Sequence, residues 1–191
     1  EEQFYIFFPL ILIALLRWFP RWARLALWAM TALSFAACLV LTDLRPTMAF
    51  YLAPTRAWEL LAGSLLAIHA PRALPAGRQW MAQALGILGL LLILGAGLGL
   101  NATTPFPGWA AVLPVAGSVA VILGGGLGGG VATRLLSTAP MRGIGLISYS
   151  LYLWHWPVIV LLRFWTIDPP TPMQMALAVG VTVILSVLSW K

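Results

Sequence analysis

The chain has 191 residues, of which 61% are hydrophobic and only 8% are charged, whereas about 25% of the residues in an average soluble domain are charged. Because so few charged residues cannot cover a water-facing surface, the composition excludes an ordinary soluble protein. It indicates a polytopic membrane protein. The formal net charge is +6, but the basic residues are scattered between apolar runs. This pattern argues against a nucleic-acid partner, which would need them clustered on one face.

Seven apolar segments follow one another along the chain. A straight helix needs about 20 residues to cross a bilayer, and most of the segments reach that length with their flanks. Helices are expected because lipid offers no partners for the open edge of a strand. The predicted fold class is therefore an all-α transmembrane helical bundle with about seven spans. The segments are residues 4–19, 25–42, 57–70, 83–100, 109–126, 143–162 and 173–190.

The connections between these segments alternate in basic content. Eight basic residues fall on one side and three on the other, which predicts that the richer side is cytoplasmic. The amino-terminal end then lies outside and the carboxyl-terminal end lies in the cytoplasm. The outer connection TDLRPTMAFYLAPTR (42–56) is expected to lie along the outer interface. All five acids fall on or near the outer side: Glu1, Glu2, Asp43, Glu59 and Asp168.

The amino-terminal stretch EEQFYIFFP offers a first candidate site. Glu1 and Tyr5 are four residues apart, so a carboxylate and a phenol share one helix face at the outer mouth. A solvated terminus beside an aromatic belt is the alternative interpretation. The chain starts without an initiator methionine and stops at the end of an apolar run, so we expect a fragment of a longer protein.

The stretch TRAWELLAGS (55–64) offers a second candidate. Arg56 and Glu59 are three residues apart and are expected to pair on one helix face. Glu59 is predicted to lie in the first turn of its helix, where the macrodipole favours an anion. Ala62 and Gly63 are expected to let another helix approach closely. An ion pair that merely anchors the helix end is the alternative.

The stretch SYSLYLWHWP (148–157) places a histidine inside an apolar segment. On a helix, Ser148, Tyr152 and His155 form one polar stripe, while the two flanking tryptophans project away from it. Pro157 is expected to kink the helix, because it lacks the N–H that would bond to the carbonyl of Leu153. An ionisable residue inside a span is a functional candidate. A histidine satisfied by a neighbouring helix is the alternative.

Three further signals carry little weight. The run GGGLGG (124–129) matches G-x-G-x-x-G, but no strand precedes it, so no dinucleotide site is predicted. Cys38 is the only cysteine, which excludes an intrachain disulfide. Two histidines on different segments do not predict a metal site, and no metal is expected.

Three ordered stretches resemble the acyltransferase-3 family of integral-membrane acyltransferases. EEQFYIFFPL resembles the end of that family's S-L-x-V-E-E-Q-F-Y-L-x-x-P motif. DLRPTMAFYLAPTRAWELLAGSLLA looks like its outer loop and following helix, closest to the branch often fused to an SGNH-type hydrolase domain. LISYSLYLWHWPVIVL is similar to its signature S-Y-x-x-Y-L-x-H-x-P. The resemblance covers essentially all 191 residues.

The resemblance implies a bacterial inner-membrane enzyme with about ten spans. Such proteins move an acyl group, usually acetyl, from cytoplasmic acetyl-CoA to a hydroxyl of lipopolysaccharide O-antigen, peptidoglycan or exopolysaccharide outside. It also implies that residues 1–191 are the carboxyl-terminal part of the transmembrane domain. The earlier spans, with the histidine usually proposed as catalytic, would precede Glu1. The chain is therefore expected not to catalyse by itself.

We interpret Glu1 and His155 as catalytic candidates and five residues as substrate-binding candidates: Tyr5, Arg56, Glu59, Ser148 and Tyr152. In this hypothesis Glu1 and Glu59 orient the acceptor sugar, Tyr5 and Arg56 hold those carboxylates, and His155 serves as a hydrogen-bond donor or proton relay. A transporter or flippase for a small solute or lipid-linked sugar is the main alternative. A seven-span receptor is a third, which the predicted topology allows.

Overall fold

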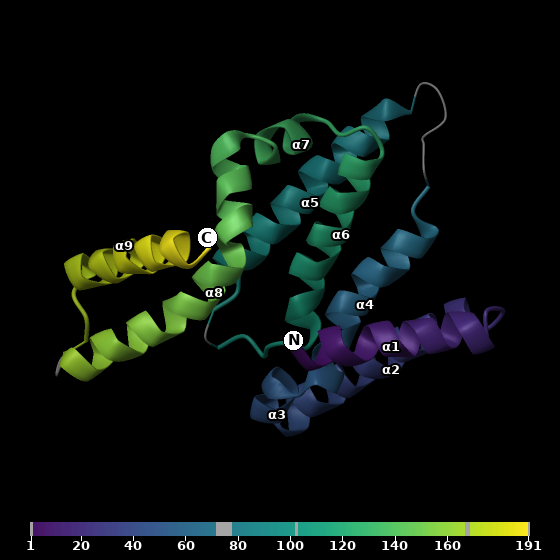
Figure 1. The fold of residues 1–191 in the computed structure, drawn as a ribbon, viewed down its shortest axis with the longest axis horizontal. Coiled ribbons are helices and arrows are strands. Elements are labelled where there is room, and N and C mark those ends of the chain that lie inside the picture. Colours follow the sequence, from purple (N-terminus) through teal and green to yellow (C-terminus); the bar gives the residue numbers. More distant parts are fainter. Residues whose placement is uncertain (1, 72–77, 102, 167–168, 191) are drawn as a thin grey trace. The chain divides into compact units, whose positions relative to one another are not determined.

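A computed structural model describes residues 2–71, 78–101, 103–166 and 169–190, and helices make up its regular structure (Figure 1). No strand occurs within these ranges. In chain order the elements are α1 (Glu2–Trp18), α2 (Ala23–Leu44), α3 (Pro46–Tyr51), α4 (Ala53–His69), α5 (Gln79–Gly99), the 3-10 helix η1 (Trp109–Ala111), α6 (Val112–Gly126), α7 (Val131–Leu136), α8 (Ala139–Trp165) and α9 (Pro172–Ser189).

Each of the seven predicted segments coincides with a helix. Five stretches are long and apolar enough to cross a membrane: α2, α5, the continuous Trp109–Gly126 stretch, α8 and α9. The helices α1 and α4 have 17 residues each, which makes each about 26 Å long, against a hydrocarbon core of about 30 Å. The all-α membrane bundle is therefore confirmed, while the count of seven spans stays a prediction.

The chain divides into two compact units, Glu1–Thr133 (unit 1) and Arg134–Lys191 (unit 2). In unit 1, α2 packs against α4, and α5 packs against α6. Two apolar clusters form its core. Leu27, Leu61 and Leu65 make the first, with Phe4 and Phe8 of α1 packed on it. The second consists of Cys38, Trp58 and Ala111.

A serine hydroxyl ties α2 to α4 inside unit 1. Ser34 Oγ donates to the carbonyl oxygen of Pro54 and accepts from the backbone N–H of Trp58 at 2.9 Å. The hydroxyl thus bridges a donor and an acceptor that lie four residues apart on α4. Inside a membrane such a bond links two helices because water is not there to compete for the polar groups. It fixes α4 against α2 at the end where α4 begins.

Glycine allows α5 and α6 to approach until their backbones meet. A Cβ on Gly89 would lie 2.5 Å from the carbonyl oxygen of Gly117, and one on Gly117 would lie 2.8 Å from that of Gly89. A Cβ on Gly124 would lie 2.7 Å from the carbonyl oxygen of Ala82. We call these four residues, Ala82, Gly89, Gly117 and Gly124, the glycine seam. Gly63 was expected to permit a close helix approach, but apart from its own stretch of α4 nothing described lies within 4 Å of a Cβ built there.

Unit 2 is a hairpin of α8 and α9, which run side by side in Figure 1. A capping box starts α9: Gln174 N donates to Thr171 Oγ1 at 3.4 Å, and Thr171 N donates to Gln174 Oε1 at 2.8 Å. The buried face of α9 carries Ala178, Thr182 and Ser186. The helix α8 continues through Pro157 and has no buried residue. Its ribbon changes direction part of the way along (Figure 1).

Candidate functional site

Arg56 and Glu59 form the predicted ion pair on α4. Two parallel hydrogen bonds join the side chains. Arg56 Nε donates to Glu59 Oε1 at 3.2 Å, and Arg56 Nη2 donates to Glu59 Oε2 at 3.0 Å. Their side chains are 34% and 19% exposed, and a bidentate arrangement fixes both the distance and the plane of the two groups. The guanidinium carbon also lies 5.4 Å from the ring centroid of Phe50 on α3. Arg56 is therefore shared between a carboxylate and an aromatic ring.

The predicted position of Glu59 in the first helical turn is wrong. The helix α4 begins at Ala53, so Glu59 is its seventh residue and the first turn holds no acid. Pro54 lies in the first turn, where its missing N–H removes no intrahelical bond. The helix therefore starts before the apolar run does. The partner that holds Glu59 is the guanidinium of Arg56, not the helix dipole.

Thr55 fixes the junction in front of the ion pair. Its side chain is 1% exposed, and its hydroxyl lies 2.7 Å from the carbonyl oxygens of both Ala49 and Leu52. These contacts close the carboxyl-terminal end of α3 onto the start of α4. The short helix α3 is thereby held in a defined place beside Arg56, which brings Phe50 under the guanidinium.

The amino-terminal candidates are only partly described. Glu1 lies outside the described residues, so its predicted pairing with Tyr5 stays a prediction. Tyr5 is 62% exposed, and its ring meets that of Phe4 edge-on at 6.1 Å. Phe4 in turn packs on the cluster formed by Leu27, Leu61 and Leu65. The segment that carries Tyr5 is therefore fixed against α2 and α4, with the phenol pointing outward.

His155 lies on α8 with one ring nitrogen held by the helix itself. Nδ1 is 2.6 Å from the carbonyl oxygen of Tyr152 and 3.2 Å from that of Leu151. A carbonyl oxygen only accepts, so these contacts assign the proton of the neutral ring to Nδ1 and leave a lone pair on Nε2. Within the described residues Nε2 has no hydrogen-bond partner.

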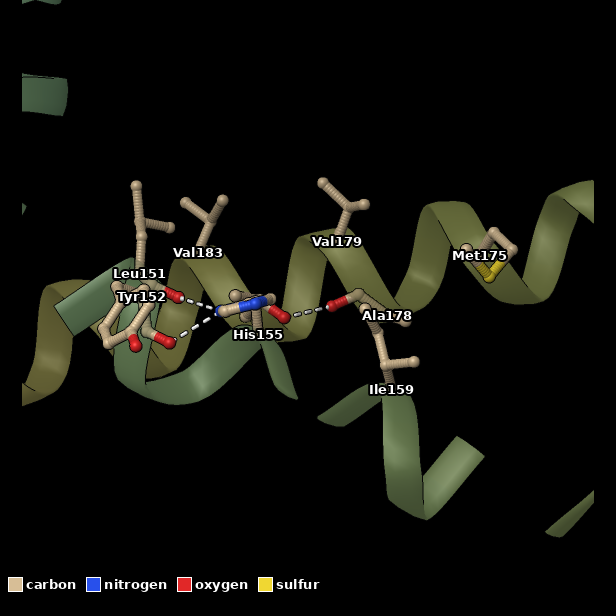
Figure 2. Close-up of a pocket in the computed structure, with 9 residues that line it drawn as sticks. Leu151, Tyr152, His155, Ile159, Met175, Ala178, Val179 and Val183 are labelled. Carbon is tan, nitrogen blue, oxygen red and sulfur yellow. Dashed lines mark hydrogen bonds between the residues drawn. The ribbon is translucent and has the colours of Figure 1, made fainter. Parts of the chain in front are cut away.

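A groove of about 380 Å³ lies between α8 and α9 beside His155. We call it the histidine groove. Figure 2 shows Tyr152 and His155 on one wall and Met175, Ala178 and Val179 on the other. The ring centroids of Tyr152 and His155 lie 5.8 Å apart. The hydroxyl of Thr182, which also lines the groove, donates to the carbonyl oxygen of Ala178 at 2.8 Å. The groove is thus apolar apart from a few groups near His155.

The predicted polar stripe on α8 is divided. Tyr152 and His155 line the histidine groove, but Ser148 does not, and its hydroxyl donates to the carbonyl oxygen of Gly145 at 2.8 Å. Trp154, expected to project away from this stripe, donates from Nε1 to Ser189 Oγ of α9 at 3.0 Å. This bond closes α9 onto α8 at the far end of the hairpin. A helical wheel of α8 alone could not show where α9 packs.

The two candidate sites, the Arg56–Glu59 pair on α4 and the histidine groove, differ in the chemistry that they can perform. The Arg56–Glu59 pair is charge-compensated and suits hydrogen bonding to hydroxyl groups. His155 presents a nitrogen that accepts a proton in a mostly apolar groove, as a general base or relay requires. Across the described residues no group of three or more His, Cys, Asp or Glu side chains gathers to hold a metal ion. Each locus lies within one unit.

Comparison with known proteins points to one family. The chain is 29% identical over 192 residues to the protein named "Putative membrane-bound transacylase BcsY" of Komagataeibacter xylinus, covering all of this chain and 47% of the relative. It is 30% identical over 204 residues to the peptidoglycan O-acetyltransferase OatA of Listeria monocytogenes, covering all of this chain and 32% of that relative.

The chain therefore spans between about a third and a half of the length of these curated relatives. No solved structure matches it. The family described as "Acyltransferase domain" matches residues 1–191, which is the whole chain. With its apolar helices and its similarity to membrane transacylases, the chain belongs to the acyltransferase-3 family of membrane acyltransferases.

Proposed function

We propose that this chain is the carboxyl-terminal part of the membrane domain of an enzyme that moves an acetyl group from cytoplasmic acetyl-CoA to a glycan hydroxyl outside the bacterial inner membrane. The observation that carries the proposal is the family match over residues 1–191. A relative named as a peptidoglycan O-acetyltransferase supports a glycan as the acceptor. Lipopolysaccharide O-antigen and exopolysaccharide are acceptors of the same chemistry.

The reaction sets three requirements. The acceptor oxygen attacks the thioester carbonyl, the C–S bond breaks, and the hydroxyl proton passes through a base to the departing thiolate of coenzyme A. The protein must supply that base, must orient both partners, and must stabilise the charge that develops on the carbonyl oxygen. The described residues concern the base and the orientation of the partners.

His155 is the proposed proton relay of this chain. Its Nδ1 is held by two backbone carbonyls and its Nε2 has a lone pair in the neutral ring, as described above. A proton taken up at Nε2 makes both ring nitrogens donors, and releasing it restores the acceptor. This geometry favours the relay over a permanent hydrogen-bond donor. The catalytic base proper is expected in the spans that precede Glu1 in the complete protein.

Glu59 and Glu1 are the proposed acceptor-orienting carboxylates. The bidentate pair leaves further lone pairs on the Glu59 oxygens for a sugar hydroxyl, while Arg56 holds the carboxylate in one orientation. Tyr5, with its phenol outward, is the proposed partner of Glu1. Tyr152 is proposed to contact substrate in the histidine groove, and Ser148 to do so outside it. A following SGNH-type hydrolase domain is part of the proposal for the complete protein.

Transfer of radiolabel tests the proposed reaction. Membrane vesicles that contain the complete protein are supplied with acetyl-CoA labelled in the acetyl group, and the extracted glycan is counted. Label is expected in base-labile ester linkage on the glycan. A transporter or flippase would move a sugar across the membrane and leave the glycan unlabelled, which would overturn the proposal.

A further inference from the structure

Unit 1 has further room for a ligand at the end where α2 is followed by α3. Two hollows of about 420 and 600 Å³ lie there between the carboxyl-terminal end of α2 and residues 100–101 and 103–110. Thr42, Asp43, Thr104 and Pro105 line both. We call the two together the loop groove. Neither the ion pair on α4 nor the histidine groove belongs to it.

Polar groups with free hydrogen-bonding capacity line the loop groove. Asp43 is exposed, and among the described residues its carboxylate makes no hydrogen bond and no ion pair. Asn101 uses its side-chain oxygen to accept from Thr103 N at 3.0 Å and from Thr104 Oγ1 at 3.2 Å. These bonds fix the amide so that its nitrogen remains available as a donor. The groove therefore offers an acceptor and a donor on opposite segments.

Aromatic rings complete the walls. Phe50 and Phe106 line the larger hollow with ring centroids 6.2 Å apart, and Trp109 lines the smaller one. Such rings bind the flat C–H faces of pyranose sugars, whose hydroxyls then point to the polar groups at the edge. Phe50 also carries the guanidinium of Arg56 over its ring. It thus joins the loop groove to the Arg56–Glu59 pair.

The groove is held in shape by a buried hydrogen bond. Gly108 N donates to Thr42 Oγ1 at 3.1 Å, and Thr42 Oγ1 donates to the carbonyl oxygen of Cys38 at 2.7 Å. Gly108 has φ +35°, and a Cβ there would lie 3.0 Å from Thr42 Cγ2. The backbone conformation therefore favours glycine, and the space beside Thr42 is tight for a Cβ. A preformed groove with few fixed polar groups is typical of a small-molecule site.

We propose that the loop groove binds a stretch of oligosaccharide built from pyranose rings with equatorial substituents. The combination of aromatic walls with a carboxylate and an amide at the edge matches such a ring. No lysine or arginine lines either hollow among the described residues, so the groove does not favour a phosphate or another anion. The inference rests on the proposed glycan acceptor and assigns part of its recognition to residues outside the proposed reaction site.

Direct binding tests the inference without relying on catalysis. The complete protein in lipid nanodiscs is titrated with cellotetraose and with the tetramer of β-1,4-linked N-acetylglucosamine by isothermal calorimetry. Binding of at least one is expected. The variant Asp43→Ala should weaken it about tenfold, as loss of one or two hydrogen bonds would. Phe50→Ala should weaken it by a similar factor. The matched control is Thr47→Ala, an exposed change on α3 outside the groove.

Measuring acyl transfer beside binding distinguishes a failure of the loop-groove proposal from a failure of the proposed reaction. With wild-type transfer intact, Asp43→Ala should raise KM for the glycan and leave kcat within about twofold. Unchanged binding in both groove variants, or no binding of either tetrasaccharide by a protein that transfers label to glycan, would overturn the groove assignment alone. Binding that is lost in Asp43→Ala, without any transfer by the wild type, would uphold the groove and overturn the proposed reaction.

Discussion

The hairpins α5–α6 and α8–α9 are both built from apolar stretches long enough to cross a membrane, but they pack in opposite ways. The first closes through the glycine seam until its backbones meet. The second is joined by side chains, including the Trp154–Ser189 hydrogen bond, and leaves the histidine groove of about 380 Å³ open. The α5–α6 pair is therefore closed by backbone contact, whereas α8–α9 leaves a groove beside the ionisable side chain of His155.

The largest effect is expected from filling the glycine seam. In Gly117→Leu the new side chain would collide with the backbone of α5, where even a Cβ comes within 2.8 Å of the Gly89 carbonyl oxygen. We expect the free energy of unfolding to fall by about 3 kcal/mol or more. The monodisperse peak of folded protein should then disappear in size-exclusion chromatography in detergent. The control is Gly97→Leu on α5, where nothing lies within 4 Å. Equal yields of the two variants would contradict the structural role of the seam.

A smaller change is expected when the histidine groove is filled instead. Ala178→Leu places extra carbons in the groove opposite His155, so acetyl transfer should fall at least about tenfold while folding is retained. Gly180→Leu on the same helix meets nothing within 4 Å and should leave transfer unchanged. If Ala178→Leu unfolds the protein as Gly117→Leu does, then the two hairpins do not differ as described.

The smallest effect is expected at the ion pair of unit 1, which neither hairpin contains. Glu59→Gln keeps the shape of the side chain but removes the charge that compensates Arg56. This change should lower the free energy of unfolding by about 1–2 kcal/mol. The loss is read from the thermal midpoint in detergent. Arg56→Lys, which cannot bond in parallel to the carboxylate, should cost less. A larger loss in Arg56→Lys than in Glu59→Gln would contradict the account of this pair.

The sequence predicted the helices well because each apolar run is long and is bounded by charged or proline-rich connections. It also predicted the Arg56–Glu59 pair, because a three-residue spacing on a helix needs no tertiary knowledge. The start of α4 was placed too late because the apolar segment begins at residue 57, whereas the helix begins at Ala53 with Pro54 in its first turn, where a proline is tolerated. The second apolar cluster, around Cys38, was likewise not predicted.

Features that depend on packing could not be predicted. The separation of Ser148 from the histidine groove follows from where α9 lies, which a single-helix wheel does not contain. The contact of Arg56 with Phe50 depends on how Thr55 closes α3 onto α4. The loop groove brings Asp43 and Asn101 together through the Gly108–Thr42 bond, between residues 66 positions apart.

The proposed mechanism makes acyl transfer onto a glycan depend on Glu1 and His155. Its most direct test is the acetyl content of the glycan made by cells whose complete protein carries Glu1→Ala or His155→Ala, at matched membrane levels of the protein. A relay or orienting role predicts a loss of at least about 100-fold in each variant. Wild-type acetylation in both variants would contradict the account.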